Sequence, residues 1–109
     1  MTVKTLADTL NAAVYALPSP DREVKGAYIG DLLSWVMGRA CADSVWITIM
    51  SNINCIAVAT LSDVSCILLA EGVTPDDELV RVANERGVNL LGCAEPAYEA
   101  ACRLSALAI

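Results

Sequence analysis

Six residues of this chain stand where a small anionic ligand could be held. They are Asp31, Ser51, Asn52, Asn54, Gly72 and Thr74. Hydroxyl and amide side chains, together with free backbone amides at the start of a helix, can bind a nucleotide phosphate. The loops that contain Asn52 and Thr74 have no Lys or Arg, however, so the simpler interpretation is that these two residues and Asp31 cap helices.

Catalytic and metal chemistry has little support among the residue types present. The chain has no histidine, which excludes Ser-His-Asp triads and zinc sites that need an imidazole. Neither a phosphate-binding GxxxxGKS or GxxxxGKT motif nor a GxGxxG motif occurs in the sequence. We therefore expect no catalytic residue, no metal site and no cofactor.

The cysteines support the same expectation. The chain has five, each at least nine positions from the next: Cys41, Cys55, Cys66, Cys93 and Cys102. An odd number at wide spacing fits neither a closed disulfide framework nor a metal-binding CxxC pair. Because each lies in or beside an apolar stretch, we expect five buried thiols in a reducing, cytoplasmic compartment.

The composition is typical of one globular domain over residues 1–109. The sequence is 56% hydrophobic and carries 7 basic and 13 acidic residues, for a net charge of −6. This much apolar surface excludes a disordered chain, and so few cations argue against nucleic-acid binding. The uncharged stretch 44–62 has 19 residues, enough to span a membrane. Its centre is the polar Ser51–Asn54, so a strand, a turn and a helix explain it better, and no membrane segment is expected.

Apolar periodicity predicts helices and strands in alternation. Helices are predicted at residues 2–11, 31–39, 52–61, 75–86 and 95–107, and strands at 23–29, 45–50, 64–70 and 88–91. Residues 13–17 could extend the first helix or form a short strand. Strands 45–50 and 64–70 are apolar at nearly every position, as strands buried on both faces are. The predicted fold is therefore α/β, a three-layer αβα domain with a mainly parallel sheet, whose carboxyl-end loops share one edge.

Several segments resemble stand-alone DRTGG-domain proteins. They are residues 21–34 (DREVKGAYIGDLLS), 46–49 (WITI), 57–59 (AVA) and 67–76 (ILLAEGVTPD). The resemblance covers nearly the whole chain and implies a single domain like the N-terminal domain of HPr kinase. In that family the domain also accompanies CBS domains in regulated pyrophosphatases and occurs in some phosphate acetyltransferases, as a regulatory or dimer-forming module. The motif that names the family, Asp-Arg-Thr-Gly-Gly, would follow the 45–50 strand, where this chain reads Ser51-Asn52-Ile53-Asn54-Cys55.

The leading functional expectation is a cytoplasmic, non-catalytic regulatory module that homodimerises and contacts an unidentified regulated protein. The alternative is a sensor for an adenine nucleotide or another phosphate compound, bound at the edge that carries Ser51, Asn52 and Asn54. An enzyme is the least supported class, because no catalytic constellation can be assembled from these residues. The high apolar content further predicts an exposed apolar patch of several hundred Å² that a dimer would bury.

Overall fold

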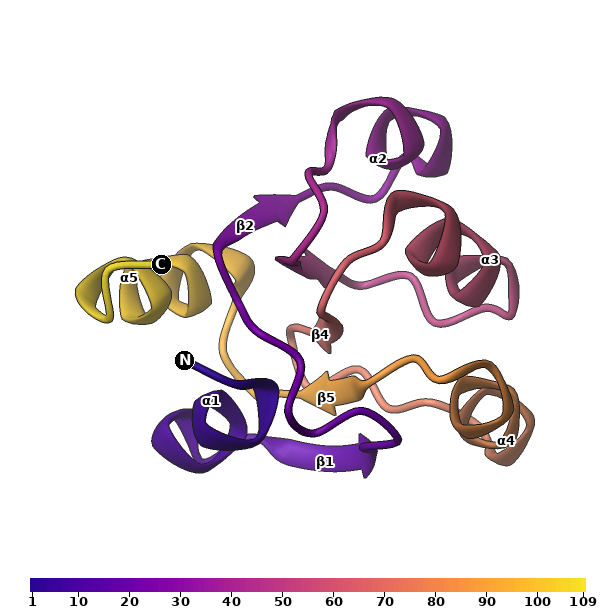
Figure 1. The fold of residues 1–109 in the computed structure, drawn as a ribbon, viewed down its shortest axis with the longest axis horizontal. Helices are drawn as coiled ribbons and strands as arrows, with labels where there is room; N and C mark the ends of the chain where they lie inside the picture. The colour runs from indigo at the N-terminus through magenta and orange to yellow at the C-terminus, as the bar shows by residue number, and fades with distance from the viewer.

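The computed structural model describes residues 1–109 and consists of one five-stranded sheet between two layers of helices (Figure 1). The strands are β1 (Ala13–Ala16), β2 (Gly26–Ile29), β3 (Ser44–Thr48), β4 (Cys66–Leu69) and β5 (Leu90–Gly92). The helices are α1 (Val3–Leu10), α2 (Leu33–Arg39), α3 (Asn54–Ser62), α4 (Asp77–Arg86) and α5 (Ala97–Ala106). The strand order is β1-β5-β4-β3-β2, in which β1 is antiparallel to β5 and the other neighbours are parallel. The α/β class and the mainly parallel sheet predicted from the sequence are confirmed.

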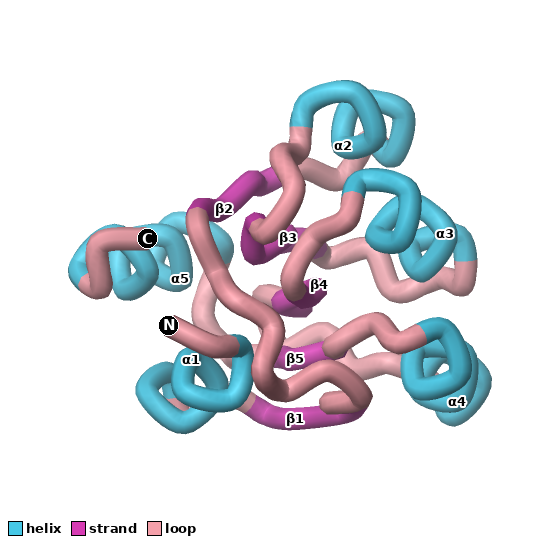
Figure 2. Tube along the Cα trace, in the orientation of Figure 1, coloured by secondary structure: helices cyan, strands magenta, loops and turns pink.

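The two faces of the sheet are covered by different helices. Helices α1 and α5 lie on one face, and α2, α3 and α4 lie on the other (Figure 2). Along β3 the side chains alternate: Trp46 packs in the core under α2–α4, while Val45 and Ile47 pack in the core under α1 and α5. Every residue of β3 and β4 is buried, which explains why the two strands are apolar except for Ser44 and Thr48 at the ends of β3.

The predicted elements are all present, and residues 13–16 form the short strand β1 rather than an extension of α1. The uncharged stretch 44–62 divides as expected into β3, a polar turn and α3. No helix in the structure combines the length and the apolar character that crossing a membrane requires.

All three predicted helix caps are wrong. Helix α3 begins at Asn54, and its N-cap is Ile53, which makes no side-chain hydrogen bond. Helix α4 begins at Asp77, and its N-cap is Asp76, whose carboxylate accepts a hydrogen bond from the Leu79 amide at 2.8 Å. Thr74 precedes Pro75, which favours an extended conformation for Thr74 and delays the helix start. Helix α2 likewise begins at Leu33, and its N-cap Leu32 makes no side-chain hydrogen bond. Asp31 therefore has another role, described below.

Arg22 joins three segments at the amino ends of the strands. Its Nε and Nη2 atoms donate to Asp43 Oδ1 at 3.2 and 3.0 Å, and Nη2 also donates to Asp63 Oδ1 at 2.9 Å and to the Asp63 carbonyl at 2.6 Å. Both aspartates have a positive φ, 64° and 56°, which non-glycine residues adopt rarely. Burial alone would lower the pKa of Arg22, but the hydrogen bonds and charges of Asp43 and Asp63 outweigh it and raise the pKa. Arg22 thus fixes the turns that lead into β3 and β4.

Replacing this guanidinium should destabilise the fold. We expect Arg22→Ala to lower the free energy of unfolding by about 2 kcal/mol, because it removes several charge-assisted hydrogen bonds at once. Urea unfolding followed by circular dichroism measures the difference. Arg81→Ala is the matched control, because it breaks only an exposed pair with Glu85 and should cost less than about 0.5 kcal/mol. Equal losses for the two variants would contradict the role of Arg22.

Candidate functional site

Asp31 connects the carboxyl ends of β2 and β3. Its Oδ1 atom accepts hydrogen bonds from the Thr48 hydroxyl at 2.8 Å and from the Ile49 amide at 3.1 Å. The Thr48 hydroxyl oxygen in turn accepts from the Met50 amide at 3.1 Å. Asp31 is therefore held in a structural network, and its negative charge lies at the edge where the sequence suggested a phosphate.

The segment Ser51–Asn54 forms the turn between β3 and α3. Asn52 is not the N-cap of α3, which is Ile53, but its Oδ1 atom accepts a hydrogen bond from the Asn54 amide at 3.0 Å where the helix begins. The backbone amides of Ser51, Asn52 and Ile53 have no acceptor within the chain, nor do the side chains of Ser51 and Asn54. These groups are the ones that an anion would meet at this edge.

Gly72 and Thr74 lie in a second loop, after β4, in which the Gly72 amide is occupied and the Thr74 amide has no acceptor within the chain. Glu71 and Gly72 both have a positive φ, 62° and 70°, in a tight turn closed by the Val73 amide on the Ala70 carbonyl at 3.1 Å. The Glu71 and Gly72 amides donate to carbonyls of the loop after β5, at 2.9 Å each. Gly72 therefore allows the positive φ of the turn, and its amide is already hydrogen-bonded and is not free to bind a ligand.

The surface has two hollows, and the larger one reaches Ile53, between Asn52 and Asn54. One is a groove of about 440 Å³ between α3 and α4, and the other is a smaller hollow of about 100 Å³ beside Arg22. None of the six predicted residues lines either hollow. No group of three or more His, Cys, Asp or Glu side chains is placed to hold a metal ion. The six predicted residues thus lie on open surface and line no preformed pocket.

Exposed apolar side chains, which the composition predicted but did not locate, lie in two places on the surface. At the carboxyl ends of β2 and β3 the exposed fractions of Ile29, Leu32 and Ile49 are 48%, 57% and 47%. A second group lies on the outer surface of α3, which includes Leu61. The sequence signal for this second group is the run Asn54–Ser62, which contains no charged residue.

The comparisons with known proteins identify the fold. The sequence matches no protein-family model and no curated protein. Among solved structures, the chain is similar to the CBS and DRTGG domains of the regulatory region of Clostridium perfringens pyrophosphatase, crystallised with its activator diadenosine tetraphosphate. The TM-score is 0.73 at 16% sequence identity, over 94% of this chain and 45% of that one. The chain thus spans less than half of that regulatory region, and the match confirms the α/β fold that the DRTGG resemblance implies.

The prediction of five buried thiols is only partly correct. Cys55 and Cys66 are buried, Cys93 is half-buried, and Cys41 and Cys102 are exposed. Burial raises the pKa of the Cys66 thiol to about 12, and it also raises the pKa values of Cys55 and Cys93. The three thiols inside the fold are therefore poor sources of thiolate.

Alkylation should separate the two classes of thiol. With iodoacetamide at about pH 8, we expect rapid modification of Cys41 and Cys102 and slow modification of the others, counted by intact mass spectrometry before and after denaturation.

The raised pKa of Cys66 also predicts that the free energy of unfolding falls as the pH rises from about 9 towards 12, because this thiol ionises in the unfolded chain at a lower pH than in the folded one. Rapid modification of Cys66 in the folded protein, or a free energy of unfolding that does not fall over this pH range, would contradict the burial of its thiol.

Proposed function

We propose that this chain is a non-catalytic regulatory module that homodimerises and acts through protein contacts. The observation that carries the proposal is the outer edge of β2, which no strand of the chain pairs with. Two further points support it: the fold resembles part of a pyrophosphatase regulatory region, and exposed apolar residues surround the β2 edge.

The two edges of the sheet differ in how they are protected. Edge strands normally carry a charge, a proline or a bulge that prevents pairing with another chain. At the β1 edge the register shifts between Val14 and Ala16, and Pro18 follows closely. Strand β2 pairs with β3 in regular register, contains no charged residue or proline, and exposes Ala27 and Ile29. Of the two edges, β2 is the one suited to pairing.

A symmetric contact follows from this geometry. Antiparallel pairing of β2 with β2 of a second copy would join the two sheets around a twofold axis, the commonest symmetry of soluble dimers. The same contact would cover Ile29, and it would bring Leu32 and Ile49 close to the partner. Burial of several large aliphatic side chains from each copy would stabilise the pair by the hydrophobic effect.

Nucleotide sensing is a second candidate, and one observation favours it. The free amides of Ser51, Asn52 and Ile53 lie together at the start of α3, where an anion is favoured by the helix dipole. The similar pyrophosphatase regulatory region was crystallised with a dinucleotide activator. The acidic Asp31 at the same edge weakens this candidate relative to the first.

The dimer is tested by a charge on the β2 edge. We expect the protein to have twice its chain mass of 11.5 kDa by light scattering at micromolar concentrations, and Ile29→Glu to have the mass of one chain, because the variant places two carboxylates in the contact. Val14→Glu is the matched control, since Val14 is as exposed as Ile29 but lies on the opposite edge strand. A single-chain mass for the unmodified protein, or dissociation by the control instead, would refute the β2 contact.

The sensor is tested by thermal shift with AMP, ATP and diadenosine tetraphosphate at millimolar concentration. If the second candidate is correct, one of these raises the melting temperature, and the double variant Asn52→Ala and Asn54→Ala abolishes the rise. Asn52→Ala also removes the hydrogen bond to the Asn54 amide, at a cost of about 1 kcal/mol. Thr2→Ala is therefore the control, because it removes a comparable bond, the side-chain cap of α1, far from this edge. No shift with any of the compounds would eliminate the candidate.

A further inference from the structure

The outer surface of α3 is unusually apolar for a helix that faces solvent. The helix has no charged residue, and its exposed side includes Ile53 at its start, Ala57 and Leu61, with exposed fractions of 44% for Ile53 and 74% for Leu61. Their spacing of four residues places them on one side of the helix, along about 12 Å. A surface helix normally presents polar residues here, so this stripe has the composition of a covered surface.

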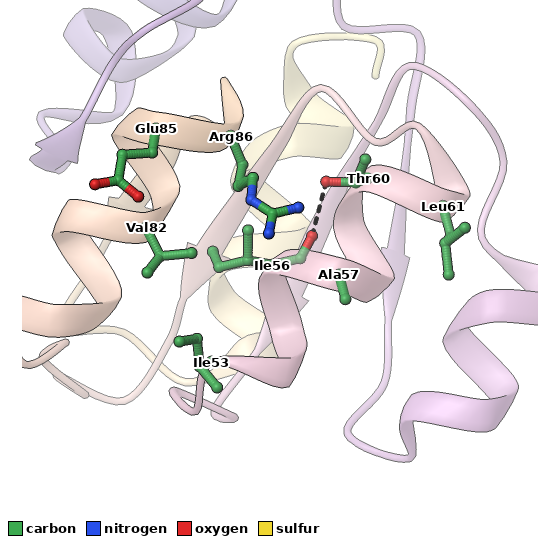
Figure 3. A pocket seen from close by; sticks show the side chains of 8 residues that line it. All are labelled: Ile53, Ile56, Ala57, Thr60, Leu61, Val82, Glu85 and Arg86. Carbon is green, nitrogen blue, oxygen red and sulfur yellow. Dashed lines mark hydrogen bonds between the residues drawn. The ribbon is translucent and has the colours of Figure 1, made fainter.

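Beside this stripe lies the groove of about 440 Å³ between α3 and α4. Figure 3 shows Val82 extending from α4 towards Ile53 and Ile56 of the α3 segment, while Arg86 reaches across from α4 towards Thr60. Glu85 points away from Arg86, and it pairs instead with Arg81 at 2.9 Å. The groove therefore has an apolar floor and a cation at one side.

Both helices that flank α3 carry a cation without an acidic partner. Five of the seven basic residues form ion pairs with carboxylates: Lys4, Arg22, Lys25, Arg81 and Arg103. The remaining two are Arg39 on α2, which stacks on exposed Trp35 at 3.7 Å from the ring centroid, and Arg86 on α4. Helices α2 and α4 are the neighbours of α3, so the two helices that carry the unpaired arginines lie on opposite sides of α3 (Figure 1).

We infer that this surface, which we call the α3 groove, binds an amphipathic helix of another protein whose apolar stripe is flanked by acidic residues. Such a helix would insert side chains at spacings of three and four residues between α3 and α4, as helix-in-groove partners do. Its carboxylates would pair with Arg39 and Arg86 in charge-assisted hydrogen bonds. The inference rests on the proposed regulatory role, since this helix would belong to the regulated protein.

Charge argues against a second copy of this chain as the occupant. A symmetric contact through the α3 groove would place Arg39 and Arg86 against the same surface of the other copy. The only carboxylate that lines the groove is Glu85, which is already paired with Arg81. A contact with some other face of a second copy would be asymmetric and would not close into a dimer. An acidic helix from another protein would supply the carboxylates that Arg39 and Arg86 lack.

The test uses fluorescence anisotropy with the full chain and labelled synthetic helices of about five turns. The peptides share one leucine stripe and differ only in the flanking residues, which are Glu, Gln or Lys. We expect the Glu peptide to bind at micromolar concentration, the Gln peptide to bind about tenfold more weakly, and the Lys peptide not to bind. Arg39→Glu combined with Arg86→Glu should reverse the order of the Glu and Lys peptides.

Leu61→Glu should remove binding of all the peptides, while Tyr98→Glu should leave binding unchanged. The two residues are equally exposed, at 74%, but Tyr98 lies on α5, on the opposite face of the sheet. Equal affinity for the three peptides, or binding that survives Leu61→Glu, would overturn the inference. So would saturable binding of dodecanoate that displaces the Glu peptide and depends on Arg86, because the groove would then be a fatty-acid site.

The masses and peptide affinities of the Leu61→Glu and Ile29→Glu variants distinguish a failure of this inference from a failure of the proposed dimer. If Leu61→Glu converts a dimer to single chains and Ile29→Glu does not, a second copy covers the α3 groove and the inference is wrong. If Ile29→Glu dissociates the dimer but no peptide binds, only the inference fails. If the protein has the mass of a single chain and still prefers the Glu peptide, the homodimer fails and the inference stands.

Discussion

Burial of β3 and β4 on both faces is the constraint on which the rest of the structure depends. A polar group inside such a sheet is costly unless it is hydrogen-bonded, and no buried side-chain nitrogen or oxygen in this protein lacks a partner. The Trp46 indole donates to the Gly30 carbonyl at 2.9 Å, and Asn89 bonds to the backbone of Ser19 and Ser65. Many of the polar groups at the two ends of the sheet are thus hydrogen-bonded within the chain, where they hold the loops to the strands.

This use of polar groups shapes what the protein can do. Asp31 and the Glu71–Gly72 turn lie where ligands of parallel α/β sheets usually bind, yet their hydrogen bonds are directed inward or to neighbouring loops. Apart from the unoccupied amides at the start of α3, the groups left over are of another kind: apolar side chains at the edge of β2 and along α3, and two arginines without carboxylate partners. Surfaces of this composition are suited to contacts with other polypeptides. Such contacts require no reactive group.

The sequence predicted most of the fold because the strongest signals were local. Apolar runs identified β3 and β4, and the polar residues Ser51–Asn54 identified the turn that separates β3 from α3. The role of Asp31 could not be predicted, since its partner Thr48 is 17 positions distant and becomes adjacent only when β2 and β3 pair. The exposure of Cys102 and the groove beside α3 likewise depend on how whole helices pack, which periodicity does not specify.

The irregular strand β1 has a consequence for the size of any assembly built on this sheet. A sheet with two regular edges can add chains at both and grow into a fibre. Here the shift in register between Val14 and Ala16 and the turn at Pro18 make one edge unsuitable as a template. Pairing at β2 would use the remaining edge and leave none for a third chain. Under the proposed β2 contact, self-association would therefore stop at two chains, because of an irregularity on the strand farthest from that contact.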